Sequence, residues 1–132
     1  MAIANLQEKL LFFARQKSSI SMQLSDVQMK QLSATKQIQT KQQNYNNQLS
    51  SLYYDDEIGY GTDEYSEQLE LMQEEHEFEM ASINSWESQL ELEKESLENQ
   101  LNEITAYETS WQKLLSNNIK IEFSYGGAGG GK

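Results

Sequence analysis

Cysteine and proline are both absent from this chain of 132 residues. Without cysteine there is no disulfide and no thiolate metal ligand, and the redox compartment stays open. Without proline, no residue interrupts a helix by removing a backbone donor. The longest apolar run, residues 10–14, is far shorter than the roughly 20 residues of a membrane span and too short for a conventional signal peptide. We therefore expect no membrane span, and either a cytoplasmic location or export without a cleaved signal.

Apolar residues are also scarce, at 37% of the chain against roughly 45–50% in globular proteins. This composition favours a narrow apolar line along long helices over a compact core. The net charge of −11 argues against nucleic acid as a partner, because phosphate binding needs clustered Lys and Arg. A basic protein surface is a more suitable partner for such a chain.

The charges that are present divide the chain in two. Residues 1–54 contain six Lys/Arg and two Asp/Glu, whereas residues 55–117 contain two Lys and 18 Asp/Glu. We interpret 1–54 as a basic helix, 55–62 as an acidic tip with two glycines, 63–117 as an acidic helix, and 118–132 as a strand-like segment with a Gly-rich, flexible tail. The fold class is then all-α: a long antiparallel two-helix coiled-coil hairpin, assembling further into a larger helical bundle.

Each predicted helix carries a seam, by which we mean a line of mostly apolar residues at alternating spacings of three and four. The first seam is Leu6, Leu10, Phe13, Lys17, Ile20, Leu24, Val27, Gln31, Ala34, Ile38, Lys41, Tyr45, Gln48 and Leu52. The second is Leu69, Met72, His76, Glu79, Ile83, Trp86, Leu90, Glu93, Leu97, Gln100, Ile104, Tyr107, Trp111 and Leu114. Seams of equal length on one chain indicate that the helices cover each other.

The tip sets the register of this pairing. Gly59 is a candidate left-handed residue closing the first helix, and Thr62 or Asp63 a candidate N-cap of the second. A pivot near residue 60 makes facing residue numbers add up to about 121. The register pairs are then Leu10 with Trp111, Phe13 with Tyr107 or Glu108, Ala34 with Trp86 or its neighbour, and Lys41 with Glu79 or Met80. A continuous helix in a parallel dimer is the competing arrangement, and it would align the acidic segments side by side.

Apolar residues also lie off the seams. They are Leu11, Phe12, Met22, Met29, Leu32, Leu49 and Tyr53 in the first helix, and Leu71, Phe78 and Leu92, separated by multiples of seven, in the second. A second apolar surface predicts that the hairpin pairs with itself or with another helical protein.

Residues that could carry chemistry are few. The only histidine, His76, shares a helix face with Glu79, in the reverse order of the Glu-x-x-His element of di-iron helical bundles. The chain has one copy of this element, and a homodimer could supply a second. The acidic tip lacks the ligand order of a calcium loop. No constellation for catalysis is present, so we expect no enzyme, no cofactor and no metal site. The alternating tail residues Ile119, Ile121 and Phe123 are a candidate strand for pairing with a partner's sheet.

The first functional hypothesis is thus a structural or scaffolding coiled coil that acts through protein–protein interaction. A component, stalk-like factor or substrate of a bacterial-type secretion apparatus is the alternative, and a metal-binding helical bundle the second alternative. The layout is similar to that of the stalk proteins of export ATPases, without a shared motif. It is also similar to small secreted Trp-x-Gly hairpins, but the tip has Ile58-Gly59 and Tyr60-Gly61 where that family has Trp-x-Gly. These comparisons assign the chain to no family.

Overall fold

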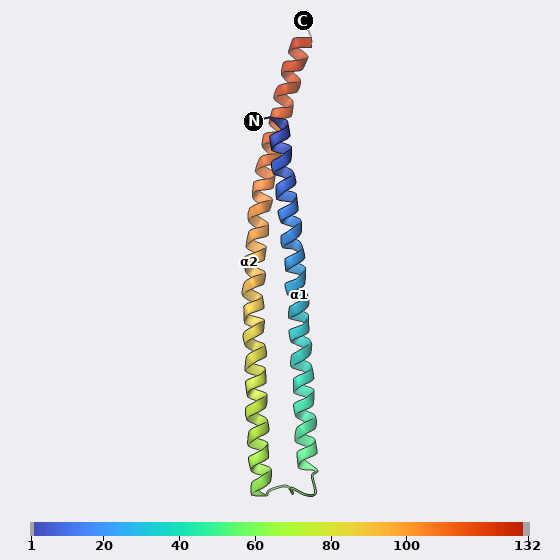
Figure 1. The fold of residues 1–132 in the computed structure, drawn as a ribbon, viewed down its shortest axis with the longest axis vertical. Helices are drawn as coiled ribbons and strands as arrows, with labels where there is room; N and C mark the ends of the chain where they lie inside the picture. The colour runs from blue at the N-terminus through green and yellow to red at the C-terminus, as the bar shows by residue number, and fades with distance from the viewer. Residues whose placement is uncertain (1, 131–132) are drawn as a thin grey trace. The chain divides into compact units, whose positions relative to one another are not determined.

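Two helices make up the fold of the described residues, in agreement with the hairpin prediction. In the computed structural model, which describes residues 2–130 and the side chains of residues 2–122, α1 spans Ile3–Tyr53 and α2 spans Asp63–Gly130 (Figure 1). The helices pack against each other and no strand occurs among the described residues, so the all-α helical hairpin is confirmed.

Both helices contribute to two compact units, which we describe separately. Unit 1 combines residues 1–26 with residues 94–132, and unit 2 is the continuous segment 27–93. Unit 2 therefore contains the loop between the helices. Unit 1 brings together segments from opposite ends of the sequence.

The loop of unit 2 is held by side chains that bind backbone groups. The Asp55 carboxylate accepts hydrogen bonds from the backbone N–H groups of Glu57, at 2.9 Å, and Ile58, at 3.3 Å. Thr62 is the N-cap of α2, since its hydroxyl oxygen accepts a hydrogen bond from the Tyr65 N–H at 3.2 Å. The sequence allowed either Thr62 or Asp63 as the N-cap, and this hydrogen bond identifies Thr62.

Gly59 has a different place in the loop from the one predicted. Its φ of +76° is left-handed, as expected, but α1 already ends at Tyr53, so Gly59 does not close that helix. Instead, its N–H donates to the Asp55 carbonyl at 3.0 Å, within the loop. Gly61, at φ +86°, provides the second left-handed position.

The core consists of apolar side chains on the facing sides of the helices. Val27, Ala34, Leu52, Ile83 and Leu90 are buried in unit 2, and Leu6, Ile20 and Leu97 in unit 1. All eight lie on the predicted seams. Along α1 every seam residue is buried or half-buried except Gln48, which is exposed while Leu49 is half-buried.

The seam of α2 differs from the prediction at alternate positions in unit 1. Gln100, Tyr107 and Leu114 are exposed, and the residue after each one is half-buried instead: Leu101, Glu108 and Leu115. Positions three and four residues beyond a seam residue lie on either side of the contact line, so a helical pattern fits both. Whether the seam residue or the residue after it is covered depends on the side of the contact line on which α1 lies.

The segment predicted as a strand is helical. Residues 119–123 lie within α2, which continues to Gly130 and extends past the start of α1 within unit 1 (Figure 1). A lone strand would leave its backbone groups without partners, whereas a continued helix satisfies them locally. The Gly-rich segment up to Gly130 also falls within the bounds of α2.

Candidate protein-interaction surfaces

An ion pair joins the two polar seam positions of unit 2. Lys41 Nζ lies 3.5 Å from Glu79 Oε1, and both side chains are a little over two-fifths exposed. Water screens a pair of this exposure, so its contribution to stability is at most about 1 kcal/mol. A shift along the helices would separate these two charges.

His76 is stacked against a tyrosine. The rings of Tyr45 and His76 are parallel to within 5°, with centroids 3.9 Å apart, at the position next to the Lys41–Glu79 pair. Each member of the suggested His76–Glu79 metal motif thus contacts a side chain of α1. Across the part of the chain that the structure describes, no group of three or more potential ligands could hold a metal ion.

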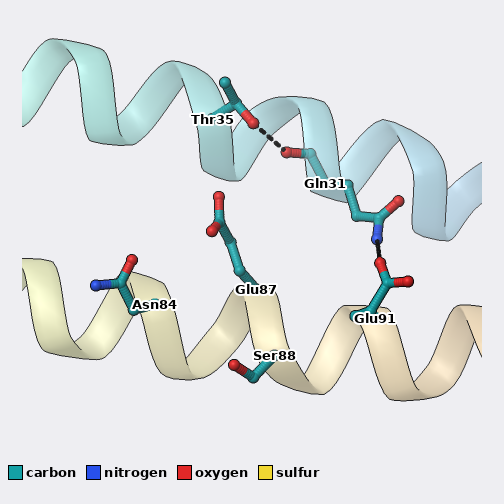
Figure 2. Close-up of a pocket in the computed structure, with 6 residues that line it drawn as sticks. All are labelled: Gln31, Thr35, Asn84, Glu87, Ser88 and Glu91. Carbon is teal, nitrogen blue, oxygen red and sulfur yellow. Dashed lines mark hydrogen bonds between the residues drawn. The ribbon is translucent and has the colours of Figure 1, made fainter.

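A polar groove lies between the helices of unit 2, around the level at which Ala34 was paired with Trp86. Contacts of Gln31 with Glu91 and of Lys41 with Glu79 bracket this level. Ala34 is fully buried and Trp86 half-buried. The open groove, of about 550 Å³, is lined by Gln31, Thr35, Asn84, Glu87, Ser88 and Glu91 (Figure 2).

The groove residues are held by few contacts. Gln31 Nε2 donates to Glu91 Oε2 at 3.0 Å, and the Thr35 hydroxyl donates to the Gln31 carbonyl (Figure 2). Only Gln31 belongs to a predicted seam. The others are ordinary polar residues of a helix surface, so no signal in the sequence distinguished them. Because the groove is shallow and open to solvent, we assign it no chemistry.

Aromatic side chains gather in unit 1. Phe13 is stacked on Tyr107, with ring centroids 6.1 Å apart, and its centroid lies 6.4 Å from that of Trp111. Leu10 is half-buried on the same side of α1. Tyr107 nevertheless remains 55% exposed.

Lys17 contacts Glu108, which lies off the predicted seam of α2. Its Nζ lies 3.3 Å from Glu108 Oε1, and the Glu108 side chain is only 18% exposed. A sum of about 121 for facing residues would place Lys17 opposite Ile104. The long lysine side chain instead reaches along α2 toward the half-buried carboxylate.

Large apolar side chains on the surface outnumber those in the core. Among the side chains that the structure describes, eight apolar residues are buried, while fifteen large apolar residues are exposed. Three of the latter, Leu71, Phe78 and Leu92, form what we call the α2 stripe of unit 2, and they are 60%, 75% and 67% exposed.

The two units differ sharply in charge. Unit 1 contains seven Lys/Arg and seven Asp/Glu, whereas unit 2 contains three Lys and 14 Asp/Glu. The whole net charge of −11 therefore belongs to unit 2. Comparing the two halves of the sequence does not reveal this, because unit 1 takes residues from both.

The tail residues proposed to bind a partner lie on α2. Ile119 and Ile121 are 46% and 53% exposed, and the side chain of Phe123 lies outside the described residues. As parts of a helix they offer side chains to a partner, and their backbone groups are not available for strand pairing.

Comparison with protein-family models, with curated proteins and with solved structures finds no match to this chain. Over the described residues, neither helix contains an apolar stretch that could cross a membrane. The geometry thus defines a helical hairpin with apolar side chains left on its surface.

Proposed function

We propose that this chain is a non-enzymatic helical scaffold that acts through protein–protein interaction, and that unit 2 binds a basic helix of its partner along the α2 stripe. The excess of exposed over buried large apolar side chains supports this function most strongly. Large apolar side chains that are exposed along one face of a protein are typical of an interaction site.

The spacing of the α2 stripe favours a helical partner. Leu71, Phe78 and Leu92 are separated by seven and fourteen residues, so they share one side of α2. That side faces away from α1, since the buried residues Ile83 and Leu90 lie on the opposite side. A partner helix presents apolar residues at the same heptad spacing.

Small side chains occupy the middle of this surface. Ala81, Ser82 and Ser85 lie between Phe78 and Leu92, and all three are exposed. They carry no charge and little bulk, so a partner backbone can approach α2 closely there. The aromatic ring of Phe78 would then serve as the main anchor, as large aromatic residues do in protein interfaces.

The charges around the stripe select a basic partner. Residues 63–93 of α2 contain eleven Asp/Glu and no Lys/Arg, and Glu67, Glu74 and Glu75 surround Leu71. A helix with Lys or Arg beside its apolar positions complements this surface, whereas an acidic helix is repelled.

A pair of synthetic helices tests the proposal. One peptide of about four heptads carries Leu at its apolar positions and Lys at the flanking positions, and the other replaces every Lys by Glu. We expect the Lys peptide alone to bind the full chain in isothermal titration calorimetry, more weakly as salt rises. Equal binding of both peptides, or of neither, would contradict the proposal.

A matched pair of variants locates the binding surface. Phe78→Ser should weaken binding of the Lys peptide about 10- to 100-fold, because burying Phe contributes about 1.5–3 kcal/mol. Met29→Ser removes a similarly exposed side chain from α1 of unit 2 and should leave the affinity within about twofold. The reverse order of effects would place the interaction on α1.

A further inference from the structure

A second apolar face lies in unit 1, which has no net charge. Tyr107, Leu114 and Ile121 follow one another at intervals of seven on α2 and are 55%, 47% and 53% exposed. Phe12 of α1, 51% exposed, adjoins this row through Phe13: the ring centroids of Phe12 and Phe13 are 5.8 Å apart. We call these four residues, Phe12, Tyr107, Leu114 and Ile121, the unit 1 face.

The unit 1 face continues into a groove between the helices. The groove has a volume of about 490 Å³, and its walls include Phe13 and Ile20 from α1 and Ile104 and Tyr107 from α2. At the other end of the face, α2 extends past the start of α1 within unit 1, and Ile121 is 53% exposed (Figure 1). The described residues thus leave this face uncovered.

The charge of unit 1 indicates which partner can pack against the unit 1 face. Unit 1 has equal numbers of basic and acidic residues, so two copies can pack together through unit 1 without net charge repulsion. Packing through unit 2 would instead bring together two surfaces with a net charge of −11 each. The strongly acidic α2 stripe suits a basic partner, whereas the unit 1 face is electrostatically compatible with itself.

Two of the charged residues near the aromatic cluster, Lys9 and Glu103, are placed suitably for twofold pairing. Lys9 lies four residues before Phe13 in α1, with its Nζ 6.0 Å from the Phe12 ring centroid. Glu103 lies four residues before Tyr107 in α2 and lines the groove. Because Phe13 stacks on Tyr107 and the helices run antiparallel, these charges flank the cluster on opposite sides along the helix axis.

We propose that the unit 1 face is the interface between two copies of the chain, packed antiparallel about a twofold axis at Phe13 and Tyr107. This axis brings Lys9 of each copy to the level of Glu103 of the other. Leu114 of each copy then lies at the level of Ile20 and Gln100 of the other, so the unit 1 face of one copy lies over the groove of its partner, as a closed twofold dimer requires. The result is a four-helix arrangement in which the groove and the exposed aromatic rings are covered.

The mass of the full chain in solution tests this dimer. Multi-angle light scattering from about 1 µM to about 1 mM spans the range in which weak specific interfaces form. We expect a concentration-dependent rise to twice the chain mass of 15.2 kDa. A mass of one chain throughout, or growth beyond two chains, would overturn the proposal.

A matched substitution identifies the surface that is used. Leu114→Glu should raise the dimer dissociation constant about tenfold or more, as expected for an apolar residue inside an interface. Leu92→Glu makes the same change on the α2 stripe of unit 2 and should leave the dimer intact. Dimerisation that survives Leu114→Glu, or that is lost with Leu92→Glu alone, would show that another surface is used.

Charge exchange provides a test that leaves the apolar surface unchanged. Lys9→Glu and Glu103→Lys should each weaken the dimer, and the double variant should recover most of the loss, because the charge pairs are restored with reversed sign. Circular dichroism confirms that each variant keeps its helices. Two single losses that simply add in the double variant would exclude the proposed twofold axis. The peptide test of the proposed function concerns unit 2. The dimer of unit 1 and the binding of a basic helix by unit 2 can therefore each fail while the other holds.

Discussion

Two leucines, two residues apart on α2, should respond very differently to the same truncation. Leu90 is 3% exposed at the contact between the helices of unit 2, whereas Leu92 is 67% exposed on the opposite side. Leu90→Ala removes buried carbon atoms worth about 0.8 kcal/mol per methylene group and leaves a cavity. Buried Leu→Ala changes cost about 2–5 kcal/mol.

The narrow interface places Leu90→Ala near the lower end of that range. A core of two helices is open at both edges, so neighbouring side chains and water can fill part of the space. We therefore expect a loss of about 2–3 kcal/mol from the free energy of unfolding. Leu92→Ala loses little apolar burial and gains helix propensity, so its effect should stay within about 0.5 kcal/mol.

Urea unfolding followed by circular dichroism at 222 nm measures both effects. The midpoints should separate clearly while the slopes remain equal to that of the parent chain. The measurement belongs at a protein concentration below that of any self-association, so that association does not add to stability. Equal losses from the two variants would refute the assignment of the buried and exposed sides of α2.

Three further predictions concern unit 2. Lys41→Glu should destabilise the chain by at most about 1 kcal/mol, and adding Glu79→Lys should recover part of the loss; the lack of coupling in a double-mutant cycle measured by thermal unfolding would remove the ion pair from the account. Gly59→Ala should cost about 1 kcal/mol in the same assay, because its φ of +76° strains any residue with a Cβ, and an unchanged melting temperature would contradict that strain. Thr62→Ala should cost about 1 kcal/mol through the lost cap on the Tyr65 N–H, whereas Thr62→Ser should be nearly neutral.

The sequence allowed much of the fold to be predicted, for identifiable reasons. Without proline, and with two glycines between two seams, the hairpin was the arrangement that covers both seams within one chain and avoids aligning the acidic segments of two chains. All eight buried apolar residues lie on those seams. Helical periodicity could not decide between Tyr107 and Glu108, because both positions flank the same contact line.

Two other features, the conformation of residues 119–121 and the division of charge between the units, could not be predicted because they depend on which segments lie together in space. The alternation from Ile119 to Ile121 is typical of a strand, but a strand needs a neighbour, and α2 simply continues. The contrast between a neutral unit 1 and an acidic unit 2 was hidden, because unit 1 joins two distant parts of the sequence. The sequence suggested a basic helix paired with an acidic helix. In the structure the charge instead separates by unit, and this difference assigns a basic partner to the α2 stripe and a second copy of the chain to the unit 1 face.

The central claim is that the chain binds a basic helix through the outer side of α2 in unit 2, and methyl NMR tests it directly. When the Lys peptide is titrated into the full chain, the methyl signals of Leu71 and Leu92 should shift together and saturate. Those of the buried Leu90 and of Met29 on α1 should move little. A titration that leaves Leu71 and Leu92 unchanged, or shifts Met29 instead, would contradict the account.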